Sequence, residues 1–191
     1  MDDIVKQAMA KWPNVPACWG WLGLDARGNW WLRDASAQAF GSFSSGVPGA
    51  KGSRVEHAKL IDFIGRNYQR DANGCWFFQN GPQQVFVALE ATPWIWRVQL
   101  QAGAMLIHSH TGVPLAAGAV QQVLVDESGA VYLAAPQGLG MVHTQDVLEL
   151  ATALEQGLLP APQEVLRNSL PDRYDFVSCP QDLAGASGPD L

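Results

Sequence analysis

One turn sequence occurs three times in this chain and limits the folds it can adopt. Asp25, Asp71 and Asp126 are each followed three residues later by Gly and then by a run of aromatic or apolar residues. An Asp at the first position of a tight turn accepts hydrogen bonds from the backbone that follows, and Gly tolerates the positive φ that such turns require. Each copy is therefore predicted to join two antiparallel strands, so short repeated hairpins should dominate the architecture.

The residues between these turns predict the other elements. Alternating apolar residues favour strands at 19–24, 29–33, 84–89, 94–100 and 105–111, and the third hairpin spans 121–133. Helices are expected over 2–11, from Arg54 to about Tyr68, from His143 to Gly157, and briefly near 163–169. Ser53 and Glu56 have capping-box spacing, and Val147, Leu148, Ala151 and Leu154 should face inward. Residues 34–52 are predicted to be a surface loop, and disorder is expected from about Gln181.

The first and third hairpins are each followed by a Gly-bearing loop and an amphipathic helix with a His at its start, His57 or His143. This repetition predicts an α+β fold of repeated antiparallel hairpin or meander units, each packed with an amphipathic helix. We expect a first hairpin-helix-sheet unit over 1–100, a second sheet-helix unit over 101–170, and a partly disordered tail over 171–191.

Composition restricts the partners that the chain can have. The 191 residues carry a net charge of −6, and only 16% are charged, so the basic clusters that nucleic acid requires are missing. The sequence has no apolar run near the roughly 18 residues of a membrane span. The acidic start at residues 2–3 argues against a secretory signal, and three cysteines without CxxC spacing suggest reduced thiols in a cytoplasmic protein.

Eight tryptophans are many for this length. Aromatic residues suit the half-buried faces of β-sheets, so most should fill a β-rich core. Some of them could instead line a ligand cleft or a partner surface, and both uses can coexist.

The middle of the chain resembles known families. The run 76–83 (WFFQNGPQ), the strand 85–89 and the segment 90–94 (EATPW) resemble an uncharacterised proteobacterial family of unknown function. The order of turn, helix, second turn and paired strands over residues 18–155 is also similar to a bacterial two-part α+β domain family of unknown function. That second family has been suggested to act in signal transduction. Neither resemblance implies a catalytic residue.

Two histidines have a spacing that suits a metal. His108 and His110 lie two residues apart in a predicted strand, so both imidazoles should project from the same face. Further ligands would have to come from Glu90, His57 or His143. The alternative is a structural role for a His beside the turn at residues 111–112.

A second group of residues suits an anion. Lys51, Arg54 and His57 surround the expected start of a helix, where free N–H groups attract negative charge. Asn80, Gln83 and Arg97 form a polar group near Trp94, and Arg97 could bind a carboxylate or pair with Glu90 instead.

The function predicted from these patterns is that of a non-enzymatic, cytoplasmic module that binds a small anionic molecule or acts in regulation. No cofactor is firmly implied, and a homo-oligomer stays open. The alternatives are a metal-dependent enzyme centred on His108 and His110, and a protein-interaction module using exposed tryptophans and residues 34–52. The predicted ligand-binding residues are Arg54, His57, Asn80, Gln83, Trp94, Arg97 and His110.

Overall fold

The computed structural model describes residues 1–101 and 104–186, and the chain divides into two compact units. Unit 1 comprises residues 1–25, 29–90 and the C-terminal segment from Phe176. Unit 2 comprises residues 26–28 and 91–175. Each unit contains a multi-stranded mixed sheet and helices, so the predicted α+β class with repeated hairpins is confirmed.

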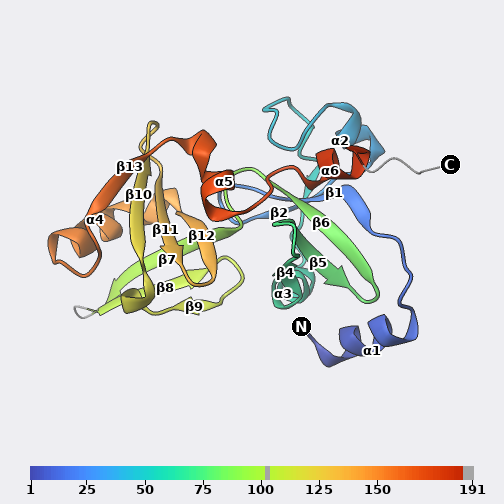
Figure 1. Cartoon of the computed structure of the whole chain (residues 1–191), viewed down its shortest axis with the longest axis horizontal. Helices are drawn as coiled ribbons and strands as arrows, with labels where there is room; N and C mark the ends of the chain where they lie inside the picture. Colours follow the sequence, from blue (N-terminus) through green and yellow to red (C-terminus); the bar gives the residue numbers. More distant parts are fainter. Residues whose placement is uncertain (102–103, 187–191) are drawn as a thin grey trace. The chain divides into compact units, whose positions relative to one another are not determined.

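Unit 1 is built on a six-stranded sheet with the order β3-β2-β1-β6-β5-β4 (Figure 1). Its strands are β1 (Cys18–Leu24), β2 (Trp30–Leu32), β3 (Ser53–Arg54), β4 (Tyr68–Arg70), β5 (Trp76–Asn80) and β6 (Gln83–Leu89). Its helices are α1 (Asp3–Lys11), α2 (Ala35–Ala39), α3 (Ala58–Arg66) and α6 (Pro180–Ala186). The pairing is antiparallel except between β1 and β6, which run parallel and join the two hairpins into one sheet.

Unit 2 is built on a seven-stranded sheet with the order β13-β10-β11-β12-β7-β8-β9 (Figure 1). Its strands are β7 (Trp94–Gln101), β8 (Ala104–Ser109), β9 (Pro114–Leu115), β10 (Gln122–Asp126), β11 (Val131–Ala135), β12 (Gly138–Val142) and β13 (Pro162–Val165). Helix α4 (Val147–Glu155) lies against β7, and the other helical segments are α5 (Leu170–Tyr174), η1 (Ala117–Ala119), η2 (Thr144–Asp146) and η3 (Arg167–Ser169).

The three Asp-led turns share one hydrogen-bond geometry, which confirms the repeated hairpin. In each turn the carboxylate Oδ1 of the Asp accepts the backbone N–H four residues later, at 2.8 Å from Asn29 and Cys75 and 2.9 Å from Ala130. The backbone N–H of the Asp donates to the carbonyl of that same residue in all three copies. The glycines have φ of 79°, 82° and 83°, so each turn uses the backbone freedom of Gly.

Two of the turns share a further contact. The second carboxylate oxygen accepts a hydrogen bond from the aromatic side chain six residues later, at 2.9 Å from Trp31 Nε1 to Asp25 and 2.6 Å from Tyr132 Oη to Asp126. Burial of Asp126 would raise the pKa of its carboxyl, but hydrogen bonds from Tyr132 and Ser128 outweigh burial and hold the pKa below its ordinary value.

The sheet of unit 1 is apolar on both faces. On one face Cys75, Phe77 and Phe86 form a core, and Trp19 stacks on Phe86 with ring centroids 3.7 Å apart. On the other face α3 packs on β5, where Phe63 meets Phe78 edge to face. A residue and its cross-strand partner point to the same face, so Phe77 pairs with Phe86 on the first face and Phe78 with Val85 on the second.

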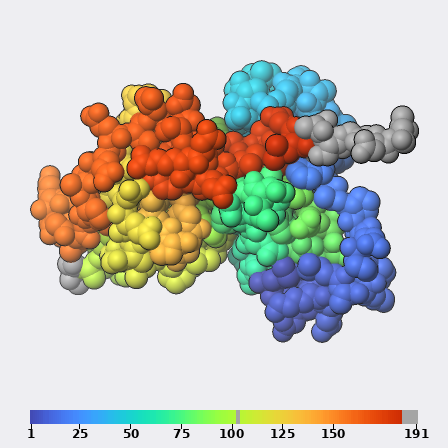
Figure 2. Space-filling model, in the orientation of Figure 1, coloured from blue at the N-terminus to red at the C-terminus, as the bar shows by residue number. Residues whose placement is uncertain are grey.

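Residues 34–52 were predicted to be a surface loop, and the structure shows an ordered segment that includes α2 (Figure 2, cyan). Arg33, only 1% exposed, organises this segment by donating to the backbone carbonyls of Ala37, Gly41 and Ala50. Phe43 packs its ring against Gly23, where an added Cβ would lie 2.4 Å from the ring. Residues 34–52 are therefore held against the rest of unit 1 by the buried guanidinium of Arg33 and the buried ring of Phe43.

The predicted capping box at Ser53 and Glu56 is wrong. Ser53 and Arg54 form the edge strand β3, and α3 starts only at Ala58, with His57 as its N-cap residue. The imidazole Nδ1 of His57 accepts from Leu60 N at 3.4 Å, and His143 Nδ1 accepts from Gln145 N at 3.2 Å ahead of α4. The helix also ends earlier than expected, because Tyr68 belongs to β4.

Other predictions for unit 2 and the C-terminal segment need correction. Of the short helix predicted near 163–169, only η3 at residues 167–169 is helical, whereas residues 162–165 form β13, which pairs parallel with β10. Helix α4 buries Leu150 and Ala153, whereas Leu148 is 82% exposed. Strand β12 was not predicted. Residues 181–186 belong to α6, and the remainder of the segment expected to be disordered lies outside the described residues.

Candidate functional site

An apolar groove of about 270 Å³ lies on the α3 face of the sheet in unit 1. Helix α3 and strands β1, β2, β5 and β6 supply its walls. None of the lining side chains carries a formal charge; they are Cys18, Trp21, Leu22, Leu32, Leu60, Phe63, Ile64, Phe78, Asn80 and Val85.

Strand register explains how residues distant in sequence meet in this groove. Leu22 pairs with Leu32 across β1 and β2, and Phe78 pairs with Val85 across β5 and β6. Since paired residues share a face, these four side chains form one apolar floor. Helix α3 covers part of that floor, and the remainder stays open.

A β-strand irregularity adds Trp21 to the groove. Adjacent residues of a regular strand point to opposite faces, yet Trp21 and Leu22 both line the groove. The register of β1 against β6 shifts between Cys18 and Leu22, where Gly20 has a φ of 79°. Trp21 therefore stands at the rim, 48% exposed, beside Leu32 at 49%.

Asn80 is the one carboxamide in the groove lining, and it differs from the neighbouring amides. Gln79 donates to Gly81 O at 2.9 Å, and Gln83 donates to Pro16 O at 3.1 Å. The exposed side chain of Asn80 makes no hydrogen bond with the described part of the chain. Its N–H donors and its oxygen are available at the rim.

The thiol of Cys18 also lines the groove. The three cysteines Cys18, Cys75 and Cys179 are free thiols. Burial raises the pKa of Cys18, so its thiol stays protonated at neutral pH and adds no charge to the groove.

A second hollow of about 300 Å³ shares Trp21 and Leu32 with the groove and is also lined by Arg33, Asp34, Gly52 and Ser53. Both formal charges here already have partners. Arg33 donates to backbone carbonyls, and Asp34 Oδ1 accepts from Ala37 N at 2.8 Å as the N-cap of α2. This hollow extends the groove toward β3.

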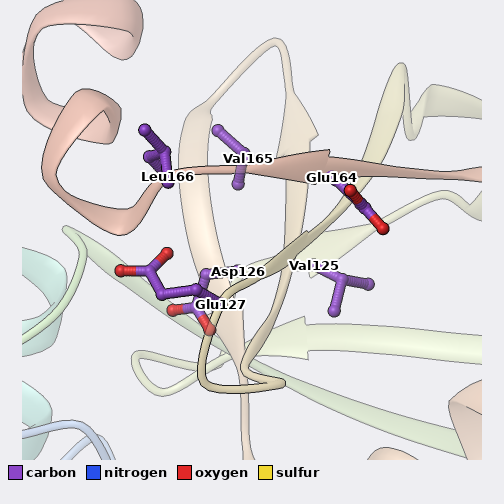
Figure 3. A pocket seen from close by; sticks show the side chains of 6 residues that line it. All are labelled: Val125, Asp126, Glu127, Glu164, Val165 and Leu166. Carbon is purple, nitrogen blue, oxygen red and sulfur yellow. The ribbon is translucent and has the colours of Figure 1, made fainter.

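Unit 2 has a hollow of about 520 Å³ at the ends of the parallel strands β10 and β13 (Figure 3). It is lined by Asp126, Glu127 and Glu164 together with Val125, Val165 and Leu166. The carboxylate of Asp126 is occupied by its own turn, and Glu127 Oε2 accepts from Arg167 N at 2.9 Å. Structural contacts account for these two carboxylates.

Four of the seven predicted ligand-binding residues lie in unit 1. Asn80 lines the groove, Gln83 is its register partner across the β5–β6 turn, and His57 caps the helix that forms one wall. Arg54 is exposed on β3. Lys51, expected beside Arg54 and His57, forms an ion pair with Glu90 at 2.7 Å.

The other three predicted residues lie in unit 2, where each has a structural contact. Trp94 is buried and donates from Nε1 to Gln137 O at 2.8 Å. Arg97 pairs with Asp146 at 2.6 Å, and not with Glu90 as the alternative proposed. His110 Nδ1 accepts from Ile95 N at 3.3 Å.

The predicted metal ligands His108 and His110 flank Ser109 at the end of β8. Among residues 1–101 and 104–186, no group of three or more His, Cys, Asp or Glu side chains is placed to hold a metal ion. The metal-dependent alternative therefore gains no further ligand from the described residues.

Sequence reasoning did not identify Trp21, Leu32 or Phe63 as site residues. All three lie in apolar sequence patterns that are typical of core residues. The one available signal was the glycine at position 20, because a glycine inside a strand pattern indicates a bulge.

The structure defines the chain as an α+β protein of two units with an apolar groove in unit 1. Comparison with known families then identifies its family. The profile of the family DUF2944, described as "Protein of unknown function (DUF2946)", matches residues 1–181. The chain belongs to this family, and as the resemblance implied, the function of the family is unknown. A search of curated proteins found no match.

Two solved structures are similar to this chain. A DUF1285 family protein from Shewanella baltica OS155 is 13% identical, with a TM-score of 0.44, covering 73% of this chain and 97% of that one. A DUF1285 family protein from Silicibacter pomeroyi DSS-3 is 11% identical, with a TM-score of 0.44, covering 68% of this chain and 67% of that one.

In the described part of the chain, every helix is too short or too polar to span a bilayer.

Proposed function

We propose that this protein is a regulatory module that binds a small, largely apolar molecule in the groove of unit 1. The observation that carries the binding proposal is an apolar floor of Leu22, Leu32, Phe78 and Val85 that helix α3 covers only in part, which leaves Leu32 49% exposed. Each methylene that a ligand buries there contributes about 0.8 kcal/mol. The regulatory part of the proposal rests on the sequence resemblance to a family suggested to act in signal transduction.

The size of the groove supports a small ligand. Its volume of about 270 Å³ lies just below the range of about 300–1,000 Å³ that is typical of small-molecule sites. Trp21 and Leu32 are exposed at its rim, and both also line the second hollow. A ligand seated over the floor would bury these two side chains and remove an exposed apolar surface.

The predicted preference for an anion is replaced in this proposal by a preference for an apolar ligand. The groove lining contains no cation, and the cations Arg33 and Lys51 are bound to backbone carbonyls and to Glu90. Moving a charged group into an apolar site without a partner is costly.

Binding of the uncharged dye phenylnaphthylamine, followed by its fluorescence, tests the proposal. The variant Leu32→Glu places a carboxylate in the groove floor and should weaken dye binding by about tenfold or more, a change of about 1.4 kcal/mol. Leu106→Glu is the matched control, because Leu106 is also a strand leucine and is 47% exposed in unit 2. Equal dye binding by wild type, Leu32→Glu and Leu106→Glu would contradict the proposal.

A further inference from the structure

We propose that the groove selects uncharged ligands that carry one hydrogen-bonding group, and that Asn80 recognises this group. This inference rests on the proposed function, because it assigns the chemical class of the ligand for the same groove. Its basis is the combination of an uncharged lining with one carboxamide at the rim.

The walls of the groove determine the chemistry of the ligand part that lies inside it. Phe63 and Phe78 meet edge to face with centroids 5.4 Å apart, and Leu60 and Ile64 flank them on α3. These four side chains offer no polar atom, so this part of the groove favours hydrocarbon or aromatic carbon. A polar group of the ligand has to be placed at the rim.

Asn80 is the one carboxamide in the groove lining that can meet that polar group. It ends β5, and its cross-strand partner is Gln83 at the start of β6. The amide of Gln83 is held by Pro16 O, and the amide of Gln79 is held by Gly81 O, whereas the amide of Asn80 has no such bond to the described residues. A carboxamide offers both a donor and an acceptor, so it complements an amide, a hydroxyl or a carbonyl group.

The absence of charge in the lining gives the site its selectivity. A carboxylate or ammonium group placed against Asn80 would lose part of its hydration without meeting a counter-ion among the lining residues. An amide or hydroxyl group loses less hydration and gains the hydrogen bond to Asn80. The ligand is therefore a neutral amphiphile.

Four compounds with the same chain separate these chemistries: octanamide, octanol, octanoate and octylamine. The concentration of each compound that displaces phenylnaphthylamine from the whole protein is measured at pH 7. Octanamide and octanol should displace the dye at concentrations at least about tenfold lower than octanoate or octylamine. Equal or stronger displacement by octanoate or octylamine would overturn the preference for uncharged ligands.

The role of Asn80 is tested with Asn80→Ala and the matched control Asn73→Ala, an exposed asparagine in the second Asp-led turn. Asn80→Ala should weaken octanamide binding about fivefold, after correction for the dye affinity of the same variant, since one neutral hydrogen bond contributes that much. Asn73→Ala should leave octanamide binding unchanged. Suppose that Leu32→Glu weakens dye binding but Asn80→Ala leaves octanamide binding unchanged. That result would refute the recognition of the ligand by Asn80, and the proposed function would still hold. Absence of dye binding would remove both.

Discussion

Asp146 binds Arg97 through two hydrogen bonds, from Nε to Oδ2 at 2.6 Å and from Nη2 to Oδ1 at 3.0 Å. The same carboxylate accepts Val98 N at 3.0 Å, and Glu149 accepts Leu100 N at 2.6 Å. Strand β12 pairs with β7 only as far as Trp96, so these carboxylates take over from β12 as acceptors for the backbone of β7. The start of α4 is thereby attached to the sheet of unit 2.

Removal of Asp146 should destabilise the protein strongly. Asp146→Ala leaves Arg97 and the Val98 N–H without their acceptor and should cost about 2–4 kcal/mol of unfolding free energy. Glu155→Ala, an exposed residue of the same helix, should cost less than about 0.5 kcal/mol. Urea unfolding followed by circular dichroism measures both, and equal stabilities of the two variants would contradict the attachment of α4 through Asp146.

The buried pair of Asp126 and Tyr132 should make stability depend on acid pH. The pKa of Asp126 in the folded state lies below its ordinary value of 3.8, so its contribution to stability is fully present above that value. The contribution is lost as the pH falls from 3.8 through the lowered pKa of the folded state. Tyr132→Phe removes one cause of the lowered pKa and should reduce the dependence of unfolding free energy on pH in this window.

Tyr174→Phe is the control for that comparison, because Tyr174 Oη is bonded to the neutral amide of Gln122. It should lower stability without altering the pH dependence. Identical pH profiles for wild type and Tyr132→Phe would show that the hydrogen bond does not stabilise the Asp126 carboxylate.

The glycines of the Asp-led turns should tolerate substitution poorly even where there is space. An added Cβ at Gly129 or at Gly118 meets nothing within 4 Å, but only Gly129 has a positive φ, of 83°. Gly129→Ala should therefore cost about 1–2 kcal/mol, whereas Gly118→Ala should be neutral or slightly stabilising. Thermal unfolding of the two variants gives the comparison, and similar melting temperatures would argue against conformational strain at the turn.

Arg33 should control the order of residues 34–52. Arg33→Lys replaces a planar fork with a single ammonium group that cannot reach the same set of carbonyls, so limited proteolysis within 34–52 should become faster. Arg54→Lys, at an exposed position on β3, should leave the cleavage rate unchanged. Unchanged protection of the segment in Arg33→Lys would show that other contacts, such as Phe43 on Gly23, hold it in place.

The local features of this fold could be predicted from the sequence, because they depend on neighbouring residues. The Asp-to-Gly turns close hydrogen bonds over four residues, and period-two patterns place the strands on either side. The start of α3 was missed because Ser53 and Glu56 have capping spacing, yet pairing of Ser53 with Leu32 across the sheet takes precedence over it.

The groove could not be predicted because its residues meet only through tertiary structure. Cys18 and Val85 become neighbours through the parallel pairing of β1 and β6, which no local pattern specifies. Likewise Arg97 and Asp146 are 49 positions apart, and the sequence offered Glu90 as a nearer acidic partner. Asn80 was predicted as a ligand-binding residue because residues 79–83 are too polar to be core.

The most direct measurement is an NMR titration of the tryptophan indole N–H signals with octanamide. Trp21 and Trp12 are similarly exposed, at 48% and 51%, but only Trp21 lines the groove. Saturable movement of the Trp21 signal with an unchanged Trp12 signal is the predicted result. No movement of Trp21, or equal movement of both signals, would contradict a binding site in the groove of unit 1.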